Sequence, residues 1–162
     1  MGMTLREFLE SQEEQLKAGQ PQAIKRRDEW IAAVDRLEGR IRDWLASSDP
    51  RGLLEVRAES CELREQGIGL YRVGRLVMAM GPRIVRLDPV ARNVVGPLSS
   101  TGVVHVIRAY GRMDLTDGLR RYYLYRTEVE PEDRWSLIKE DGYDLQPLNQ
   151  ASFEAALQDL LE

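Results

Sequence analysis

Apolar positions near the N-terminus recur with a helical spacing. Thr4 and Glu7 have the spacing of a capping box, which predicts that a helix begins at Leu5. Gly19 and Pro21 provide a C-terminal stop, so the predicted helix covers residues 5–18. Its narrow apolar stripe consists of Leu5, Phe8, Leu9 and Leu16.

A second helix is predicted over about residues 22–46. Its apolar positions alternate between spacings of four and three, which is the strongest secondary-structure signal in the chain: Trp30, Val34, Leu37, Ile41 and Trp44. If the two helices form an internal hairpin, this stripe is buried within the domain. If they project from it, the stripe is an exposed apolar surface that needs a partner or a second copy of the chain.

After the polar residues 47–52, the sequence pattern changes to short runs of residues that are either apolar or alternate between apolar and polar. Such runs are typical of an antiparallel meander. The candidate strands are 53–58, 61–65, 69–73, 76–80, 84–89, 103–115, 119–127, 135–140 and 143–146. The Asp-Gly pairs in Thr116-Asp117-Gly118 and Glu140-Asp141-Gly142 predict two hairpins. The polar stretch 96–102 is expected to be a loop, and Asn149 is expected to cap a final helix.

These elements predict one α+β domain over residues 1–162, a length typical of a single core. A helical segment (1–50) precedes a curved antiparallel sheet or open barrel of six to nine strands (51–148). A C-terminal helix (149–162) follows. With 43% hydrophobic and 31% charged residues, the composition indicates a globular chain. We expect a cytoplasmic protein, because the chain shows no apolar run of membrane-spanning length and no signal-peptide pattern.

Charge is unevenly distributed along the chain. Residues 1–50 have a net charge of -2, residues 51–127 of +6 and residues 128–162 of -8. The basic sheet region and the acidic C-terminal region can neutralise each other within the domain. Alternatively, arginines gather on an exposed sheet face and bind an anionic partner.

Arginine and tyrosine are concentrated around the first Asp-Gly turn. Strand alternation places them on sheet faces that would suit single-stranded nucleic acid, since guanidinium groups bind phosphate and tyrosine rings stack on bases. The candidate residues are Arg108, Tyr110, Arg112, Arg120, Tyr122 and Arg126. The competing interpretation is that these side chains pair across strands with one another and with carboxylates.

Little catalytic chemistry is available in this composition. The single cysteine, Cys61, and the single histidine, His105, exclude a disulfide and most metal clusters, and both fit packed positions in strands. We expect no cofactor and no metal site. A metal-dependent hydrolase or nuclease using Asp114 and neighbouring acids is the least favoured alternative, because their spacing matches no metal loop.

Four segments of the chain resemble bacterial single-domain proteins of similar length that have no assigned activity. They are residues 26–34, 43–45, 89–96 and 153–161. The resemblance implies a bacterial, stand-alone domain and transfers no functional residue. The leading hypothesis is therefore a non-enzymatic binding or accessory protein whose partner is another protein or a second copy of itself. Nucleic-acid binding is the alternative.

Overall fold

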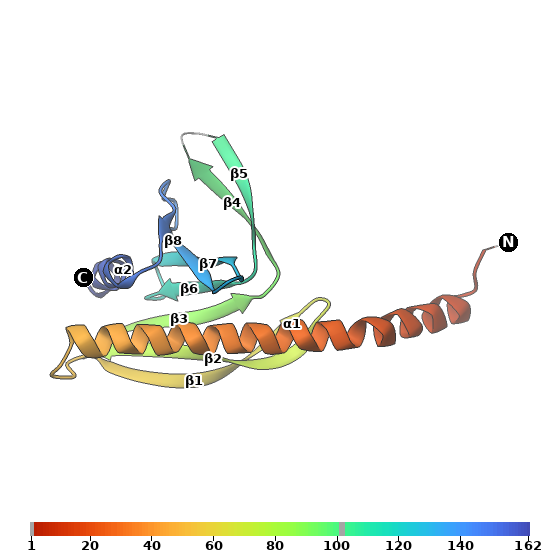
Figure 1. Cartoon of the computed structure of the whole chain (residues 1–162), viewed down its shortest axis with the longest axis horizontal. Helices are drawn as coiled ribbons and strands as arrows, with labels where there is room; N and C mark the ends of the chain where they lie inside the picture. Colours follow the sequence, from red (N-terminus) through yellow and green to blue (C-terminus); the bar gives the residue numbers. More distant parts are fainter. Residues whose placement is uncertain (1, 101–102) are drawn as a thin grey trace.

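The computed structural model describes residues 2–100 and 103–162, and side chains outside residues 94–108. One long helix, α1 (Leu5–Ser48), begins at the predicted capping box, and its C-terminal part packs on one face of an open antiparallel sheet (Figure 1). The sheet is followed by α2 (Gln150–Leu161), which Asn149 caps. The predicted α+β class, with an antiparallel sheet and a C-terminal helix, is confirmed.

The predicted two-helix N-terminal segment is wrong, because Pro21 lies inside α1 without ending it. A proline in a helix interior removes one backbone donor and usually breaks the helix. Residues 13–22 of α1 are all exposed, so water can hydrate the carbonyl that Pro21 leaves without a donor. α1 instead ends at Ser48, where the Asp49 carboxylate accepts hydrogen bonds from the backbone of Leu53 and Leu54 at 2.9 and 2.8 Å. These bonds lower the pKa of Asp49.

The main sheet has seven strands in the order β1-β2-β3-β6-β7-β8-β9. A separate two-stranded arm is inserted between β3 and β6 and rises from the sheet (Figure 1). The strands of the sheet are β1 (Glu55–Glu65), β2 (Gly69–Met80), β3 (Arg83–Ala91), β6 (Arg112–Thr116), β7 (Arg121–Glu128), β8 (Arg134–Lys139) and β9 (Gln146–Pro147). The arm consists of β4 (Val94–Ser100) and β5 (Val103–Ala109).

Several predicted strand limits are corrected. The candidates 53–58 and 61–65 merge into β1, and 69–73 and 76–80 merge into β2, because eleven consecutive residue pairs hold β1 against β2. The expected loop at 96–102 is wrong over residues 96–100, because these residues form backbone pairs with β5. The amino-acid composition of the segment does not predict this pairing, since the partner strand lies elsewhere in the sequence. Residues 101–102 lie outside the described residues.

The predicted strand 103–115 is divided by Gly111, whose φ of +150° strongly favours glycine. A Cβ atom at Gly111 would lie 2.1 Å from the Trp30 ring, so the glycine lets α1 approach the sheet closely at this point. The Thr116-Asp117-Gly118 hairpin is confirmed between β6 and β7. Of the candidate 143–146, only Gln146 belongs to a strand, β9.

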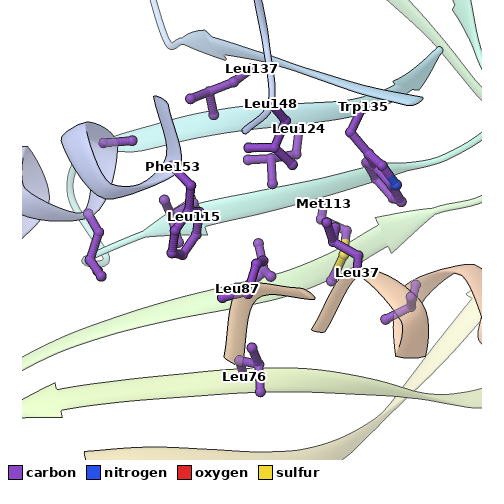
Figure 2. Packing of buried hydrophobic residues seen from close by; sticks show 14 of the residues in the cluster. Leu37, Leu76, Leu87, Met113, Leu115, Leu124, Trp135, Leu137, Leu148 and Phe153 are labelled. Carbon is purple, nitrogen blue, oxygen red and sulfur yellow. The ribbon is translucent and has the colours of Figure 1, made fainter. Parts of the chain in front are cut away.

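Both helices cover the same face of the sheet, and the core lies between them and the strands. Figure 2 shows side chains of this core: Leu37, Leu76, Leu87, Met113, Leu115, Leu124, Trp135, Leu137, Leu148 and Phe153. A smaller cluster of Ala109, Tyr125 and Ile138 lies on the opposite face. The architecture therefore buries the C-terminal half of α1 and leaves its N-terminal half beyond the sheet.

Candidate functional site

The strongest apolar stripe of the sequence belongs to the core. Trp30, Val34, Leu37 and Ile41 are at most 1% exposed. Trp30 packs against Trp135 with ring centroids 6.0 Å apart, and the half-buried Trp44 packs against Phe153 at 5.9 Å. The residues predicted as partner-binding candidates therefore pack α1 against its own sheet and α2.

The exposed apolar surface of α1 lies further towards the N-terminus, in residues 5–27, which we call the free half of α1. The first buried residue of the helix is Trp30, and the N-terminal turns extend past the sheet (Figure 1). Leu5 is 71% exposed, Leu9 56% and Leu16 72%. The sequence signal for this surface was present in the stripe of the predicted first helix, but an internal helical hairpin, one of the two arrangements considered, would have covered it.

These exposed leucines lie on the side of α1 that carries the core stripe. An α-helix turns by about 100° per residue, so Leu5, Leu9, Leu16 and Ala23 fall within about 40° of one another. Leu9, Leu16 and Ala23 precede Trp30 at seven-residue intervals. The apolar side that α1 buries on the sheet therefore continues along the free half without a partner among the described residues.

The free half is also polarised in charge. Residues 4–16 contain four acidic side chains and one basic, whereas residues 17–27 contain four basic and none acidic. Of the acidic residues, Glu7 lies in the first turn, where the helix dipole favours negative charge. One ion pair, Glu13 with Lys17 at 3.0 Å, joins the two regions along the helix surface. The helix thus presents an acidic end and a basic end on either side of Leu16.

The candidate nucleic-acid residues do not share one face of the sheet. In the β6–β7 register Asp114 lies opposite Tyr123, and Met113 lies opposite Leu124. Directly opposite residues share a face, so Arg112 and Asp114 lie on the face away from the helices. Tyr122 and Arg126, which alternate with Tyr123, lie on the helix-covered face.

On the face away from the helices, the charges are paired. Arg112 donates to both carboxylate oxygens of Asp114 at 2.8 and 2.9 Å, and Arg121 donates to the same carboxylate at 3.1 Å. The Arg112 guanidinium lies 4.4 Å from the centroid of the Tyr123 ring. Two arginines therefore occupy the carboxylate that the hydrolase alternative assigned to a metal.

On the helix-covered face, Arg126 is fully buried. It donates to Asp133 at 2.6 and 2.9 Å and to Glu29 of α1 at 3.2 Å. This ion pair ties the strand β7 to the helix at the point where the free half begins.

The remaining candidates at the C-terminal helix are also paired. The Tyr122 hydroxyl donates to Asp159 of α2 at 2.6 Å, and Arg120 lies 3.6 Å from the same residue. Burial, with a smaller effect of the Asp159 carboxylate, raises the pKa of Tyr122 to about 12. Tyr110 is 39% exposed beneath the Arg92 guanidinium. The side chains of Arg108 and His105 lie outside the described residues.

The Cys61 thiol is engaged within the sheet, and the described residues form no metal-ligand cluster. The half-buried thiol of Cys61 donates to the carbonyl of Val73 at 3.5 Å, and burial raises its pKa. No group of three His, Cys, Asp or Glu side chains able to hold a metal occurs among the residues described. A groove of about 680 Å³ beside the 129–135 loop contains Arg36, whose guanidinium pairs with Asp133 at 2.7 Å.

Comparison with known proteins adds no relationship. In the described part of the chain, neither helix has the combination of length and apolar character needed to cross a membrane. No protein-family model, curated protein or solved structure matches the chain.

Proposed function

We propose that this chain is a non-enzymatic binding protein that engages another polypeptide through the free half of α1. The observation that carries the proposal is the exposure of Leu5, Leu9 and Leu16 on one side of a helix that projects beyond the sheet. Burying a leucine side chain contributes about 1.5–3 kcal/mol relative to leaving it in water. A partner that covers these three residues would therefore gain stability at a surface that the domain itself does not cover.

The form of this surface fits recognition of a helix or an apolar groove. Binding of this kind uses anchors on one side of a helix at spacings of three, four and seven residues. Leu5, Leu9 and Leu16 have spacings of four and seven. The helix is already continuous with its buried half, so a partner does not have to order this segment from a coil.

The other hypotheses have less support from the geometry. Arg112 and Arg126 lie on opposite faces of the sheet, and each is paired with a carboxylate. A nucleic acid would have to compete with those ion pairs and would not find the candidate residues on one surface. Asp114 is similarly engaged by Arg112 and Arg121.

A photoreactive amino acid at position 16 tests the proposal in cells that make the protein. The matched control places it at Ala18, which is exposed on the opposite side of the same helix turn. We expect covalent protein adducts from position 16 and few from position 18. Equal adduct yields at both positions, or none at either, would refute the assignment of the free half as the binding surface.

A further inference from the structure

We infer that α1 contains a hinge at residues 19–21, about which residues 5–18 bend as a short helical segment. The hinge goes beyond the proposed function, because it concerns movement within the chain and requires no partner. Three features of the described residues carry it: the residue types at 19–21, the exposure of that part of the helix, and the separate stabilisation of the helix on either side.

The sequence Gly19-Gln20-Pro21 is unfavourable for a helix at three successive positions. Glycine loses more backbone freedom in a helix than any other residue, and proline has the lowest helix propensity. Pro21 has no amide hydrogen to donate to the carbonyl of Lys17, and its ring disfavours the helical conformation of Gln20. Sharp bends in helices occur mainly at residues of these types. The sequence therefore favours bending at this point of α1.

Among the described residues, no packing opposes such a bend. Residues 13–22 are all exposed, and a Cβ atom added at Gly19 would meet no other atom within 4 Å. The first side chain that α1 buries is that of Trp30, about 14 Å beyond Pro21 at a rise of about 1.5 Å per residue. Bending at residues 19–21 therefore breaks no contact with the sheet.

The helix is stabilised independently on the two sides of the hinge. Before it, Thr4 and Glu7 exchange the two capping-box hydrogen bonds at 2.8 and 3.2 Å. In the same segment, Glu13 pairs with Lys17 at 3.0 Å. After the hinge, the fully buried Trp30 begins the packing on the sheet. Each side thus has stabilising contacts of its own and can stay helical while the connection between them bends.

The hinge controls the direction of the exposed apolar surface. Leu5, Leu9 and Leu16 all precede Gly19 in the chain. Bending at residues 19–21 therefore turns these three side chains together and leaves the sheet in place. Under the proposed function, the same domain can present this surface to a partner at different angles.

Residual dipolar couplings of the backbone amides test the hinge in the full, isotopically labelled chain. In a rigid α1, the couplings of residues 5–18 and of residues 30–48 would have the same magnitude. We expect those of residues 5–18 to be roughly twofold smaller, because bending averages them. Gly19→Ala/Pro21→Ala should restore their full size, whereas the matched control Gly39→Ala, at an exposed glycine of the same helix, should leave them reduced.

The Cα chemical shifts of the same samples show whether residues 5–18 are helical. Helical shifts together with reduced couplings are the expected result. Couplings of full size in the wild-type chain would overturn the inference, whether the helix is straight or permanently kinked. Reduced couplings that the double variant does not restore, or random-coil shifts over residues 5–18, would also overturn it. Either result would place the motion within the segment itself and not at residues 19–21.

Discussion

Glu38 is a carboxyl group buried on the sheet side of α1, and its replacement by glutamine gives a test of the packing. Its side chain lies against Gly74 of β2, where a Cβ atom would be 3.0 Å from its Oε2. Its Oε1 is buried without a hydrogen-bond partner among the described atoms. Burial raises the pKa of Glu38 to about 7, and the nearby Asp35 adds to the rise while Arg42 opposes it.

The sign of the effect follows from proton linkage. Because the folded-state pKa exceeds the unfolded value of 4.5, the folded protein binds more protons between these values and loses stability as the pH rises through them. A shift from 4.5 to about 7 corresponds to about 3 kcal/mol at ~1.4 kcal/mol per pH unit. Contact of the carboxylate with nearby solvent reduces this to about 1–2 kcal/mol.

We therefore expect Glu38→Gln to raise the free energy of unfolding by about 1–2 kcal/mol at about pH 8 and to change it little at about pH 4.5. Urea unfolding followed by tryptophan fluorescence measures both values. Glu10→Gln, at an exposed position of the same helix, is the matched control. An equal loss of stability at both pH values would refute the reasoning, because it would show that the carboxylate is stabilised by contacts in the folded state.

Three further substitutions test other parts of the fold. Gly111→Ala should destabilise the domain by about 3 kcal/mol or more, because the new Cβ overlaps the Trp30 ring; a midpoint in thermal unfolding close to that of the wild type would contradict this. Arg126→Ala should cost about 3–5 kcal/mol, because it removes a fully buried guanidinium that is paired with both Asp133 and Glu29. The double variant Arg126→Ala/Asp133→Ala should lose less unfolding free energy than the sum of the two single variants, as measured by chemical denaturation. Losses that simply add would argue against the ion pair. Pro21→Ala should increase the helical circular dichroism signal without lowering the unfolding midpoint of the core; an unchanged signal would indicate that the proline does not limit the helix.

Local signals in the sequence predicted the N-terminal caps of both helices and one hairpin. Thr4 forms the capping box with Glu7, Asn149 caps α2, and the Asp-Gly pair after Thr116 forms the predicted hairpin. Each of these signals acts within a few residues and does not depend on the tertiary fold.

Features that depend on distant partners were not predictable in the same way. Pro21 predicts a stop, yet the helix passes through it on an exposed turn, where water can hydrate the carbonyl that loses its donor. The strand at 94–100 is defined by β5, and the separation of Arg112 from Arg126 onto opposite faces is set by the β6–β7 register. A shift of one residue in such a register moves every side chain to the other face, and alternation within one strand does not fix the register of its neighbour.

The free half of α1 illustrates the same limit for the candidate site. The stripe of Leu5, Leu9 and Leu16 was visible in the sequence, but whether it is covered depends on where the sheet ends. The stronger stripe, which includes Trp30 and Ile41, was the more conspicuous partner-binding candidate and is buried in the core. Exposure of the weaker stripe is therefore a tertiary property that the periodicity alone does not contain.

Hydrogen exchange of the backbone amides of α1, compared between residues 5–27 and residues 30–48, tests the central claim most directly. If the domain leaves the free half of α1 uncovered, the amides of residues 5–27 should exchange faster than those of residues 30–48, which the core protects. Amides of β2 and β7 should be as well protected as those of residues 30–48. Equal protection of the two parts of the helix would contradict the account.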